Sequence, residues 1–323
     1  MKILIVRNDG IGDIILTLPA ISGIRRLYPD ASISILVSPY TKDILWNNKD
    51  IDEIIVDDKG IFETSKMLFK TKFDIAFIFY PNLRNAFISF LAGIPERIGT
   101  GYKPCGILFN KRRYIHRRDI HESNWCLKLV NSQQTVVHSP KIFVKDEDLK
   151  YAKSLISEIP EPIIGIHPGC KGSALNWTSE RYTKLIEKIE ERYKTRPIIT
   201  GGMNDKQVID RIIRETKANP LNLYGKTNLG ELIALISLFS IFIGPSTGPL
   251  HIASCLGVKT IGLFPLISSQ SPKKWHPLGE NYYLLTPDII CKEKRCKGLK
   301  CKEYNCMERI KEEDILEKIE ECI

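Results

Sequence analysis

The stretch that decides the fold of this chain is Ile241-Phe242-Ile243-Gly244-Pro245-Ser246-Thr247-Gly248-Pro249-Leu250-His251-Ile252-Ala253. Its short apolar run, 241–243, predicts a buried strand that stops at the Gly-Pro pair. Ser246 or Thr247 then suits the N-cap of a helix from Pro249 to about Leu256. The N–H groups and dipole at such a helix start attract a phosphate or diphosphate, which His251 is placed to reach. An ordinary strand-turn-helix with a satisfied histidine is the alternative, and this stretch alone does not separate the two.

The chain opens on the same pattern. The near-continuous apolar run Lys2-Ile3-Leu4-Ile5-Val6-Arg7 predicts a strand of a parallel sheet covered on both faces, followed by a glycine turn and a helix. A nicotinamide cofactor is disfavoured, because Ile15 replaces the third glycine of a dinucleotide fingerprint and Ser38 ends the next strand without an acidic residue. Asp13 lies at the carboxyl end of the first strand, where ligands bind in open α/β sheets. Its alternative role is to stabilise its own helix.

Strands and helices alternate along the whole chain, which predicts an α/β fold. Prolines 160 and 162 border a predicted helix at 145–159, so we expect two domains, 1–158 and 159–323. In the second domain, the turns at His167, Gly201 and Thr247 fall at one edge of a sheet and are expected to line an interdomain cleft. Further strands are predicted at 32–37, 53–56, 74–79, 163–166, 197–200, 221–223 and 260–264.

The net charge and hydrophobic content of the chain limit the classes of partner to expect. The chain has 323 residues, 43% of them hydrophobic, with a net charge of +9, which favours an anionic small molecule, an anionic lipid surface or nucleic acid. A merely soluble, lysine-rich surface is the alternative. Nucleic acid is disfavoured because few aromatic residues interleave with the basic ones. Arg112, Arg113, Arg117 and Arg118 are candidates to receive an anionic acceptor, although scattered surface ion pairs are commoner. No run is long enough to span a bilayer and no secretory signal pattern is present, so we expect a cytoplasmic protein.

Four of the nine cysteines form a ladder with a uniform spacing of five: Cys291, Cys296, Cys301 and Cys306. Four thiolates suit a structural zinc ion, and the lysines between them would lower the thiol pKa values. The usual zinc pattern, however, has two tight pairs separated by a long gap. Disulfides are the other interpretation, though less expected in a reducing compartment. The segment 291–306 therefore has two open interpretations besides ordinary free thiols.

Several motifs together carry a resemblance to a known family. They are Arg7 with Gly12-Asp13, Arg97-Ile98-Gly99, His167-Pro168-Gly169, Asn176-Trp177, Gly201-Gly202, the stretch from Ser246 to Ala253, Gly262-Leu263-Phe264 and the cysteine ladder. In this order and spacing the chain resembles glycosyltransferase family 9, the ADP-heptose–lipopolysaccharide heptosyltransferases. The resemblance implies the GT-B fold, in which two Rossmann-like domains with parallel sheets face each other across a cleft. Domain 1–158 would hold the acceptor, and domain 159–323, with the Cys-rich segment and a C-terminal helix, the nucleotide-sugar.

The resemblance also implies roles for individual residues. Asp13 would be the general base of an inverting transfer that needs no obligatory metal and no cofactor beyond the nucleotide-sugar substrate. Arg7, Gly12 and Arg84 would contact the acceptor. The donor would be bound by Gly169, Cys170, Lys171, Asn176, Asn204, Thr227, Ser246, Thr247, Gly248 and His251, of which Thr247, Gly248 and His251 match the diphosphate motif.

Two positions depart from the family pattern. Leu175 occupies the place where some members have a lysine, and Lys171 is the nearest substitute cation; Ser246 replaces an acidic or amide residue that often precedes Thr-Gly. Both bear on the donor's identity. The implied reaction transfers heptose from ADP-heptose to a lipopolysaccharide-core or related lipid-linked saccharide, at the inner face of the inner membrane with peripheral contact. A GT-B nucleotide-sugar epimerase and a non-catalytic nucleotide or sugar binder are the alternatives.

Overall fold

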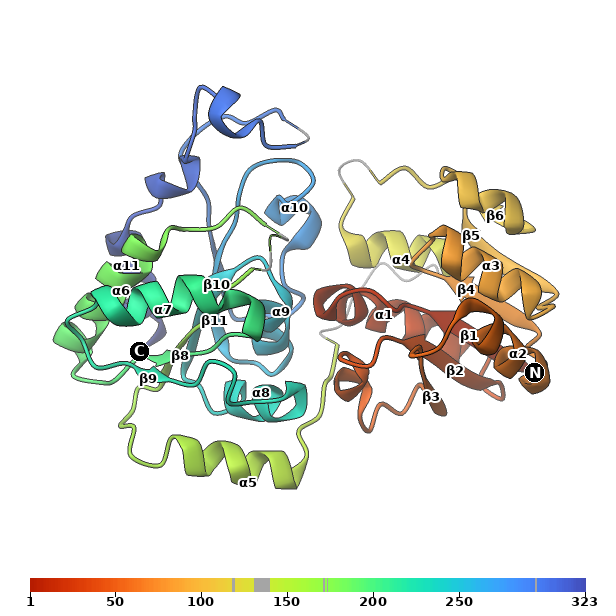
Figure 1. Cartoon of the computed structure of the whole chain (residues 1–323), viewed down its shortest axis with the longest axis horizontal. Coiled ribbons are helices and arrows are strands. Elements are labelled where there is room, and N and C mark those ends of the chain that lie inside the picture. The colour runs from red at the N-terminus through yellow and green to blue at the C-terminus, as the bar shows by residue number, and fades with distance from the viewer. Residues whose placement is uncertain (118–119, 131–139, 171, 173, 294) are drawn as a thin grey trace. The chain divides into compact units, whose positions relative to one another are not determined.

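The computed structural model describes residues 1–117, 120–130, 140–170, 172, 174–293 and 295–323. They form two compact units, Met1–Phe143 and Val144–Ile323 (Figure 1). The division falls before helix α5 (Asp146–Leu155), whereas the sequence had placed it after residue 158. The reason is packing: α5 lies against α8 (Leu229–Ile236), and Tyr151 Oη donates to Lys226 O at 3.2 Å. The prolines that follow α5 thus lie within the second unit and do not mark its border.

The first unit is built on a six-stranded parallel sheet with the order β3-β2-β1-β4-β5-β6. Its strands are β1 (Lys2–Val6), β2 (Ser32–Val37), β3 (Glu53–Val56), β4 (Ile75–Ile78), β5 (Glu96–Thr100) and β6 (Lys111–Arg113). Its helices are α1 (Ile11–Leu27), α2 (Ile61–Thr71), α3 (Leu83–Leu91) and α4 (Glu122–Val130), with short 3-10 turns η1 (Lys42–Leu45) and η2 (Pro104–Leu108). Strand β1 is central and buried, as its apolar run predicts.

The second unit repeats this arrangement with the order β12-β11-β10-β7-β8-β9, again all parallel. The strands are β7 (Ile164–Ile166), β8 (Ile198–Ile199), β9 (Leu221–Asn222), β10 (Ile241–Pro245), β11 (Lys259–Leu263) and β12 (Tyr282–Leu285). Besides α5 and α8, the helices are α6 (Ser179–Tyr193), α7 (Lys206–Glu215), α9 (Gly248–Cys255), α10 (Pro272–Trp275) and α11 (Glu312–Cys322), with 3-10 turns η3 (Met203–Asp205), η4 (Gly298–Lys300) and η5 (Cys306–Arg309). The predicted α/β class is confirmed.

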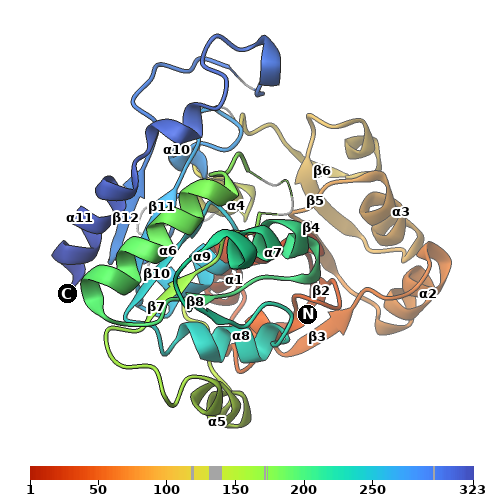
Figure 2. The ribbon, with the colours of Figure 1, turned by 60° about the vertical axis from the view of Figure 1, so that its left-hand side comes forward.

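Each sheet has one place where the strand order reverses. Counted within its own unit, each sheet has the order 3-2-1-4-5-6, the doubly wound arrangement. The reversal lies between β1 and β4 in the first unit. In the second unit it lies between β7 and β10 (Figure 2). The loops after these strands diverge to opposite faces of the sheet, and ligands of open α/β sheets bind in the crevice between them.

The deciding stretch folds largely as predicted. Strand β10 leads into α9 through Ser246 and Thr247, although β10 continues to Pro245, two residues beyond the predicted end. Thr247 is the N-cap residue by backbone conformation, but its hydroxyl donates to Pro245 O at 3.3 Å and makes no cap bond to the helix. The helix start is therefore not closed by its own side chain.

Across the described ranges of the chain, none of the helices combines the length and apolar character that crossing a membrane requires.

Candidate active site

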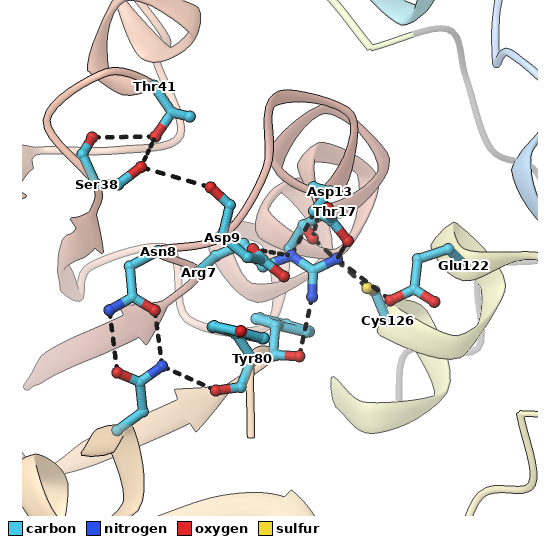
Figure 3. A network of polar contacts seen from close by, with 12 residues as sticks. Arg7, Asn8, Asp9, Asp13, Thr17, Ser38, Thr41, Tyr80, Glu122 and Cys126 are labelled. Atoms are coloured by element: carbon cyan, nitrogen blue, oxygen red, sulfur yellow. Dashed lines mark hydrogen bonds and ion pairs between the residues drawn. The ribbon is translucent and has the colours of Figure 1, made fainter. Parts of the chain in front are cut away.

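Arg7 follows β1 directly and is the centre of a polar network in the first unit (Figure 3). Its side chain is only 1% exposed. Nη1 donates to Phe79 O at the end of β4 (2.9 Å), and Nε donates to the main-chain oxygen of Asp13 (3.1 Å). Nη2 donates to Asp13 Oδ1 (3.0 Å) and to Glu122 Oε1 (3.2 Å). A buried guanidinium is tolerated only when its donors are satisfied, so these bonds fix α1 and α4 against the reversal point of the sheet.

Three carboxylates surround Arg7, and their access to solvent differs. Asp9 Oδ1 lies 3.3 Å from Arg7 Nε, and the Asp9 side chain is 15% exposed. Glu122 is 1% exposed, whereas Asp13 is 29% exposed. The Asp13 carboxylate also lies close against the backbone of Gly10, where a Cβ would come within 2.8 Å of Asp13 Oδ2. Of the three, Asp13 is the fixed carboxylate that a ligand in solution can reach.

The electrostatics of the network favour proton uptake by Asp9 and Asp13. Burial raises the pKa of Asp13; the Arg7 guanidinium opposes this shift and the Glu122 charge adds to it. Burial likewise raises the pKa of Asp9 to about 7, again against Arg7. Burial alone would lower the pKa of Arg7, but Asp9 and Asp13 outweigh it and raise the pKa instead. A carboxylate with a raised pKa is the kind of group that accepts a proton during catalysis near neutral pH.

Helix α4 supplies the part of the network that sequence reasoning missed. Glu122 Oε1 accepts from Arg7 and, at 2.9 Å, from Arg117 Nη2. The Arg117 guanidinium lies 3.7 Å from the centre of the Trp125 ring. Arg117 is one of the four arginines that were candidates to receive an acceptor; the structure shows it paired with Glu122. Arg118 lies outside the described residues.

The predicted acceptor residues occupy different positions around this network. Gly12 lies half-buried in the first turn of α1. Arg7 is buried with its donors engaged, so we infer that it positions Asp13 and does not itself contact an acceptor. Arg84, on α3, forms a two-pronged ion pair with Asp57 after β3 and is 33% exposed. Asp57 also accepts from the side chain of Asn8, which places the Arg84–Asp57 pair beside the turn that carries Asp13.

The second unit joins its three predicted turns around His167, which follows β7. His167 N donates to Ile243 O of β10 (2.9 Å), and its Nδ1 lies 2.9 Å from Thr200 Oγ1 after β8. Its Nε2 lies 4.0 Å from Asp205 Oδ2. A Cβ on Gly244 would come 3.2 Å from His167 O. These contacts confirm that the turns meet at one edge of the sheet, at its reversal point.

Gly169 is required where it stands. A Cβ at this position would come 2.1 Å from Asp205 Cγ, so the turn after His167 passes directly over the Asp205 carboxylate. Asp205 is 4% exposed, and its Oδ2 accepts from Gly202 N at 2.9 Å. The carboxylate is thus directed at its own backbone turn and does not face solvent.

Other predicted donor residues shape this region. The Asn176 amide is engaged within the unit: Nδ2 donates to Pro168 O (2.6 Å), and Oδ1 accepts from Trp177 N and Tyr182 Oη (both 2.8 Å). We infer that Asn176 positions the turn. Cys170 is half-buried and its thiol donates to Ala174 O at 3.4 Å. Lys171 lies outside the described residues.

The remaining donor residues lie on α9 and near η3. Ser246, Thr247 and Gly248 are half-buried at the start of α9, and His251, one turn on, is 3% exposed. Asn204 is exposed in η3, and Thr227 is half-buried before α8. Pro249 has no N–H, and the N–H groups of Leu250 and His251 donate to Thr247 O. The main-chain N–H groups of Thr247 and Gly248 are therefore the ones that the start of α9 offers to a ligand, next to a partial positive charge.

The cysteine ladder borders a cavity of about 780 Å³ in the second unit, whose wall includes Cys291, Cys296, Cys301, Cys306, four nearby lysines and Asn176. All nine cysteines are free thiols, so the disulfide interpretation is wrong for this structure. Within the part of the chain that the structure describes, no three His, Cys, Asp or Glu side chains are arranged to hold a metal ion. The zinc interpretation thus finds no support in the arrangement. Burial and the other three thiols raise the pKa of Cys306.

A family model described as glycosyltransferase family 9 (heptosyltransferase) matches residues 61–305. The chain belongs to glycosyltransferase family 9. This confirms the resemblance inferred from the motifs and makes the protein a glycosyltransferase, which sets aside the epimerase and the non-catalytic binder. The match runs from α2 of the first unit to the cysteine ladder of the second.

Two similar proteins align with the chain along most of their length. A putative glycosyltransferase of Haemophilus influenzae is 26% identical over 299 residues, 86% of this chain and 86% of that protein. Lipopolysaccharide heptosyltransferase 3 of Escherichia coli is 26% identical over 301 residues, 84% of this chain and 83% of that protein.

Solved structures show that the family 9 fold is shared. A family 9 glycosyltransferase from Veillonella parvula superposes with a TM-score of 0.88 at 21% identity, covering 99% of this chain and 96% of the other. The ADP-heptose lipopolysaccharide heptosyltransferase II of Escherichia coli gives 0.84 at 20% identity, covering 100% and 98%. The predicted GT-B fold class is confirmed.

Proposed function

We propose that this family 9 enzyme transfers heptose from ADP-heptose to a saccharide of the lipopolysaccharide core, or to a related lipid-linked saccharide. The names of similar proteins support the substrate class: one relative is a lipopolysaccharide heptosyltransferase, and one solved structure is an ADP-heptose heptosyltransferase. We further propose that the first unit holds the acceptor and the second the donor. The turns of the first unit carry carboxylates that suit a base, and the turns of the second carry the start of a helix that suits an anionic leaving group.

The observation that carries the proposal is the Asp13 carboxylate, which is held by Arg7 and is the most exposed of three carboxylates at the carboxyl end of β1. An acceptor hydroxyl that donates to Asp13 becomes a nucleophile as its proton moves to the carboxylate. Its oxygen forms the new bond to the anomeric carbon while the bond to the β-phosphate oxygen breaks, so ADP leaves. Attack from the face opposite the leaving group inverts the anomeric centre.

The second unit supplies what the leaving diphosphate needs. Thr247 and Gly248 lie at the start of α9, where main-chain N–H groups and the helix dipole stabilise negative charge. His251 lies on the same helix, one turn further. The Gly169 turn is packed over the Asp205 carboxylate and has no room for a side chain. Because fixed dipoles provide this stabilisation, we propose that the reaction needs no divalent metal.

The charge of the chain, +9 overall, suits an acceptor that carries anionic groups and a lipid anchor. We propose that the enzyme works at the cytoplasmic face of a membrane by peripheral contact. Nucleic acid is not part of this proposal.

A nucleotide panel tests the donor assignment first. ADP, GDP, UDP and CDP are added separately, and the melting temperature of the protein is measured. Ligands that bind only the folded protein raise it, so we expect the largest increase with ADP. Equal increases with all four, or none, would contradict the ADP-linked donor.

A transfer assay then tests the reaction. ADP-heptose and a core saccharide acceptor that lacks heptose are incubated with the enzyme, and the anomeric configuration of the product is read by NMR. We expect ADP release matched by product, with a configuration opposite to that of the donor. Retention of configuration would exclude a single displacement assisted by Asp13.

A further inference from the structure

Helix α3 of the first unit is apolar on the side that faces solvent. Its exposed side chains are Leu83 (62%), Phe87 (44%), Phe90 (47%) and Leu91 (43%). They are spaced at i, i+4, i+7 and i+8 and therefore share one face. The face turned toward the sheet carries Asn85 and Ser89 together with small apolar residues. This is the reverse of the polarity expected of a surface helix in a monomer.

Helix α2 continues the apolar surface. It packs beside α3, and both views show the two helices side by side (Figures 1 and 2). Phe62 is 80% exposed and Phe69 is 60% exposed, with the exposed Lys66 between them on the same face. A Cβ on Gly93, just after α3, would lie 3.6 Å from the Phe69 ring, so Phe69 lies against the end of α3.

The turn η2 and the residues around β6 extend the surface on the other side of α3. Turn η2 packs against α3, and its Ile107 is 75% exposed. Tyr114, just after β6, is 61% exposed and meets the half-exposed Tyr102 edge to face at 5.5 Å. Phenylalanine, leucine and isoleucine with tyrosine at the margin are the residues that enter the interface of a lipid bilayer.

Positive charge is concentrated in the same elements. From Ile61 to Tyr114, spanning α2 to β6, the chain has nine Lys and Arg against three Asp and Glu, a net charge of +6. The whole chain of 323 residues has a net charge of only +9. Each Lys or Arg near an anionic lipid surface strengthens the electrostatic attraction of the protein to that surface. The apolar side chains contribute further binding energy when they insert into the bilayer interface.

We propose that the surface formed by α2, α3, η2 and β6, here the docking surface, binds the acidic headgroups of a membrane and inserts its apolar side chains. The proposal rests on the proposed function in that a lipid-linked acceptor brings the enzyme to a membrane. A second copy of the chain is a poorer occupant, because a symmetric contact would set two surfaces of the same positive charge against each other. The docking surface belongs to the unit that we propose holds the acceptor.

Flotation with vesicles tests the docking surface without nucleotide or saccharide. Wild-type protein is mixed with vesicles of phosphatidylglycerol and phosphatidylethanolamine, or of phosphatidylcholine alone. We expect binding to the first and little to the second. The variant Phe87→Ser/Leu91→Ser should weaken binding by at least about tenfold, because each side chain loses buried apolar area. Lys66→Gln/Lys70→Gln should weaken binding more at low salt than at high salt.

The matched control is Leu27→Ser/Tyr151→Ser, which removes apolar side chains of comparable exposure, 51% and 39%, outside the docking surface. This control should bind vesicles as the wild type does. The proposal is overturned if wild type does not float with acidic vesicles, if the control loses binding equally, or if Phe87→Ser/Leu91→Ser instead converts a dimer to a monomer with flotation unchanged. ADP binding is measured on the wild type and on every variant. If the wild type does not bind ADP, the proposed function is contradicted, whereas flotation alone decides the docking surface.

Discussion

The two units fold with the same strand order, yet the turns at their reversal points carry different groups: charged side chains in the first unit, and glycines with a helix start in the second. After β1 of the first unit, Arg7, Asp9 and Asp13 lie together with Glu122 and Arg117, so five ionisable side chains share a small volume. After β7 and β10 of the second unit, the described residues of the corresponding turns include glycines, hydroxyl side chains and the start of a helix. Its carboxylate, Asp205, is 4% exposed and accepts from its own turn.

The difference shows how one backbone geometry serves two tasks. The carboxyl edge of a parallel sheet places a glycine turn and a helix start beside a ligand in both units. A base needs a carboxylate that is held in place and has a raised pKa, which burial beside Glu122 provides for Asp13. An anionic leaving group needs N–H donors with no carboxylate competing for them, which the second unit provides.

The largest expected effect comes from removing the base. Asp13→Asn keeps the shape of the side chain and its place beside Arg7 but abolishes proton acceptance, so kcat should fall roughly a thousandfold. The affinity for ADP should not change, because the donor turns belong to the other unit. Steady-state kinetics and calorimetric titration with ADP separate the two parameters.

Asp30→Asn is the matched control, since Asp30 is exposed at the end of the loop after α1; its kcat should equal that of the wild type. If Asp13→Asn retained most of its activity, another group would be the base and the contrast between the units would lose its meaning. A parallel loss of ADP affinity would also contradict the separation of tasks.

A smaller effect is expected from adding a methyl group to Gly169, in the turn that we propose faces the donor. In Gly169→Ala the new Cβ would come 2.1 Å from Asp205 Cγ, so the turn or the carboxylate must move. Overpacking of this kind costs about 1–3 kcal/mol, and we expect ADP affinity to fall about tenfold to a hundredfold. Titration calorimetry with ADP measures the loss, and the melting temperature reports on folding.

Gly60→Ala provides the comparison for Gly169→Ala. Gly60 has a φ of −65°, and its added Cβ would meet no atom closer than 3.9 Å. Its ADP affinity should therefore be unchanged. Wild-type affinity in Gly169→Ala would mean that this turn does not face the donor.

The sequence predicted those features that short stretches encode. Apolar runs followed by glycine located β1 and β10, and with them Asp13 and the helix start after Thr247. The partner of Arg7 on α4 was missed because Glu122 lies 115 residues further along the chain, and no local pattern indicates that contact. Arg7 was predicted to contact the acceptor; because its side chain is buried, we propose that it positions Asp13.

Packing between helices also escaped prediction. The prolines after α5 indicated a domain border, but the contact of α5 with α8 assigns that helix to the second unit. The apolar residues of α3 suggested nothing unusual, because hydrophobic periodicity does not say which face of a helix meets the sheet. In the structure Phe87 and Leu91 face solvent and Asn85 faces the core.

A third prediction concerns stability and the buried charge of the first unit. Burial raises the pKa of Asp9 from 3.8 to about 7, so the folded state binds a proton more tightly than the unfolded state does. Stability should therefore fall as pH rises from about 4 to about 7, and the full penalty is present above that range. Asp9→Asn removes it and should raise the free energy of unfolding by up to about 4 kcal/mol at about pH 8, with little change at about pH 4.

Urea denaturation at both pH values measures this difference. Asp210→Asn is the comparison: Asp210 is about half-exposed in an ion pair with Lys206 on α7, so its replacement should change stability little at either pH. If Asp9→Asn destabilised the protein equally at both pH values, the ion pair of Asp9 with Arg7 would stabilise the fold by more than the burial of the Asp9 charge costs.

The smallest expected effect is that of a chelator. It follows from the turns of the second unit, where the Asp205 carboxylate is directed away from the ligand. Transferases that hold a diphosphate through a divalent metal need exposed carboxylates beside it, since Mg²⁺ and Mn²⁺ prefer oxygen ligands. Here the carboxylate at the described turns, Asp205, is directed inward, and the start of α9 offers N–H groups to the phosphates. Excess EDTA should therefore leave kcat/KM unchanged, and added Mg²⁺ should not raise it. A marked loss that Mg²⁺ or Mn²⁺ restores would show that the helix start alone does not stabilise the leaving group, and that the two units do not divide the charges as their turns indicate.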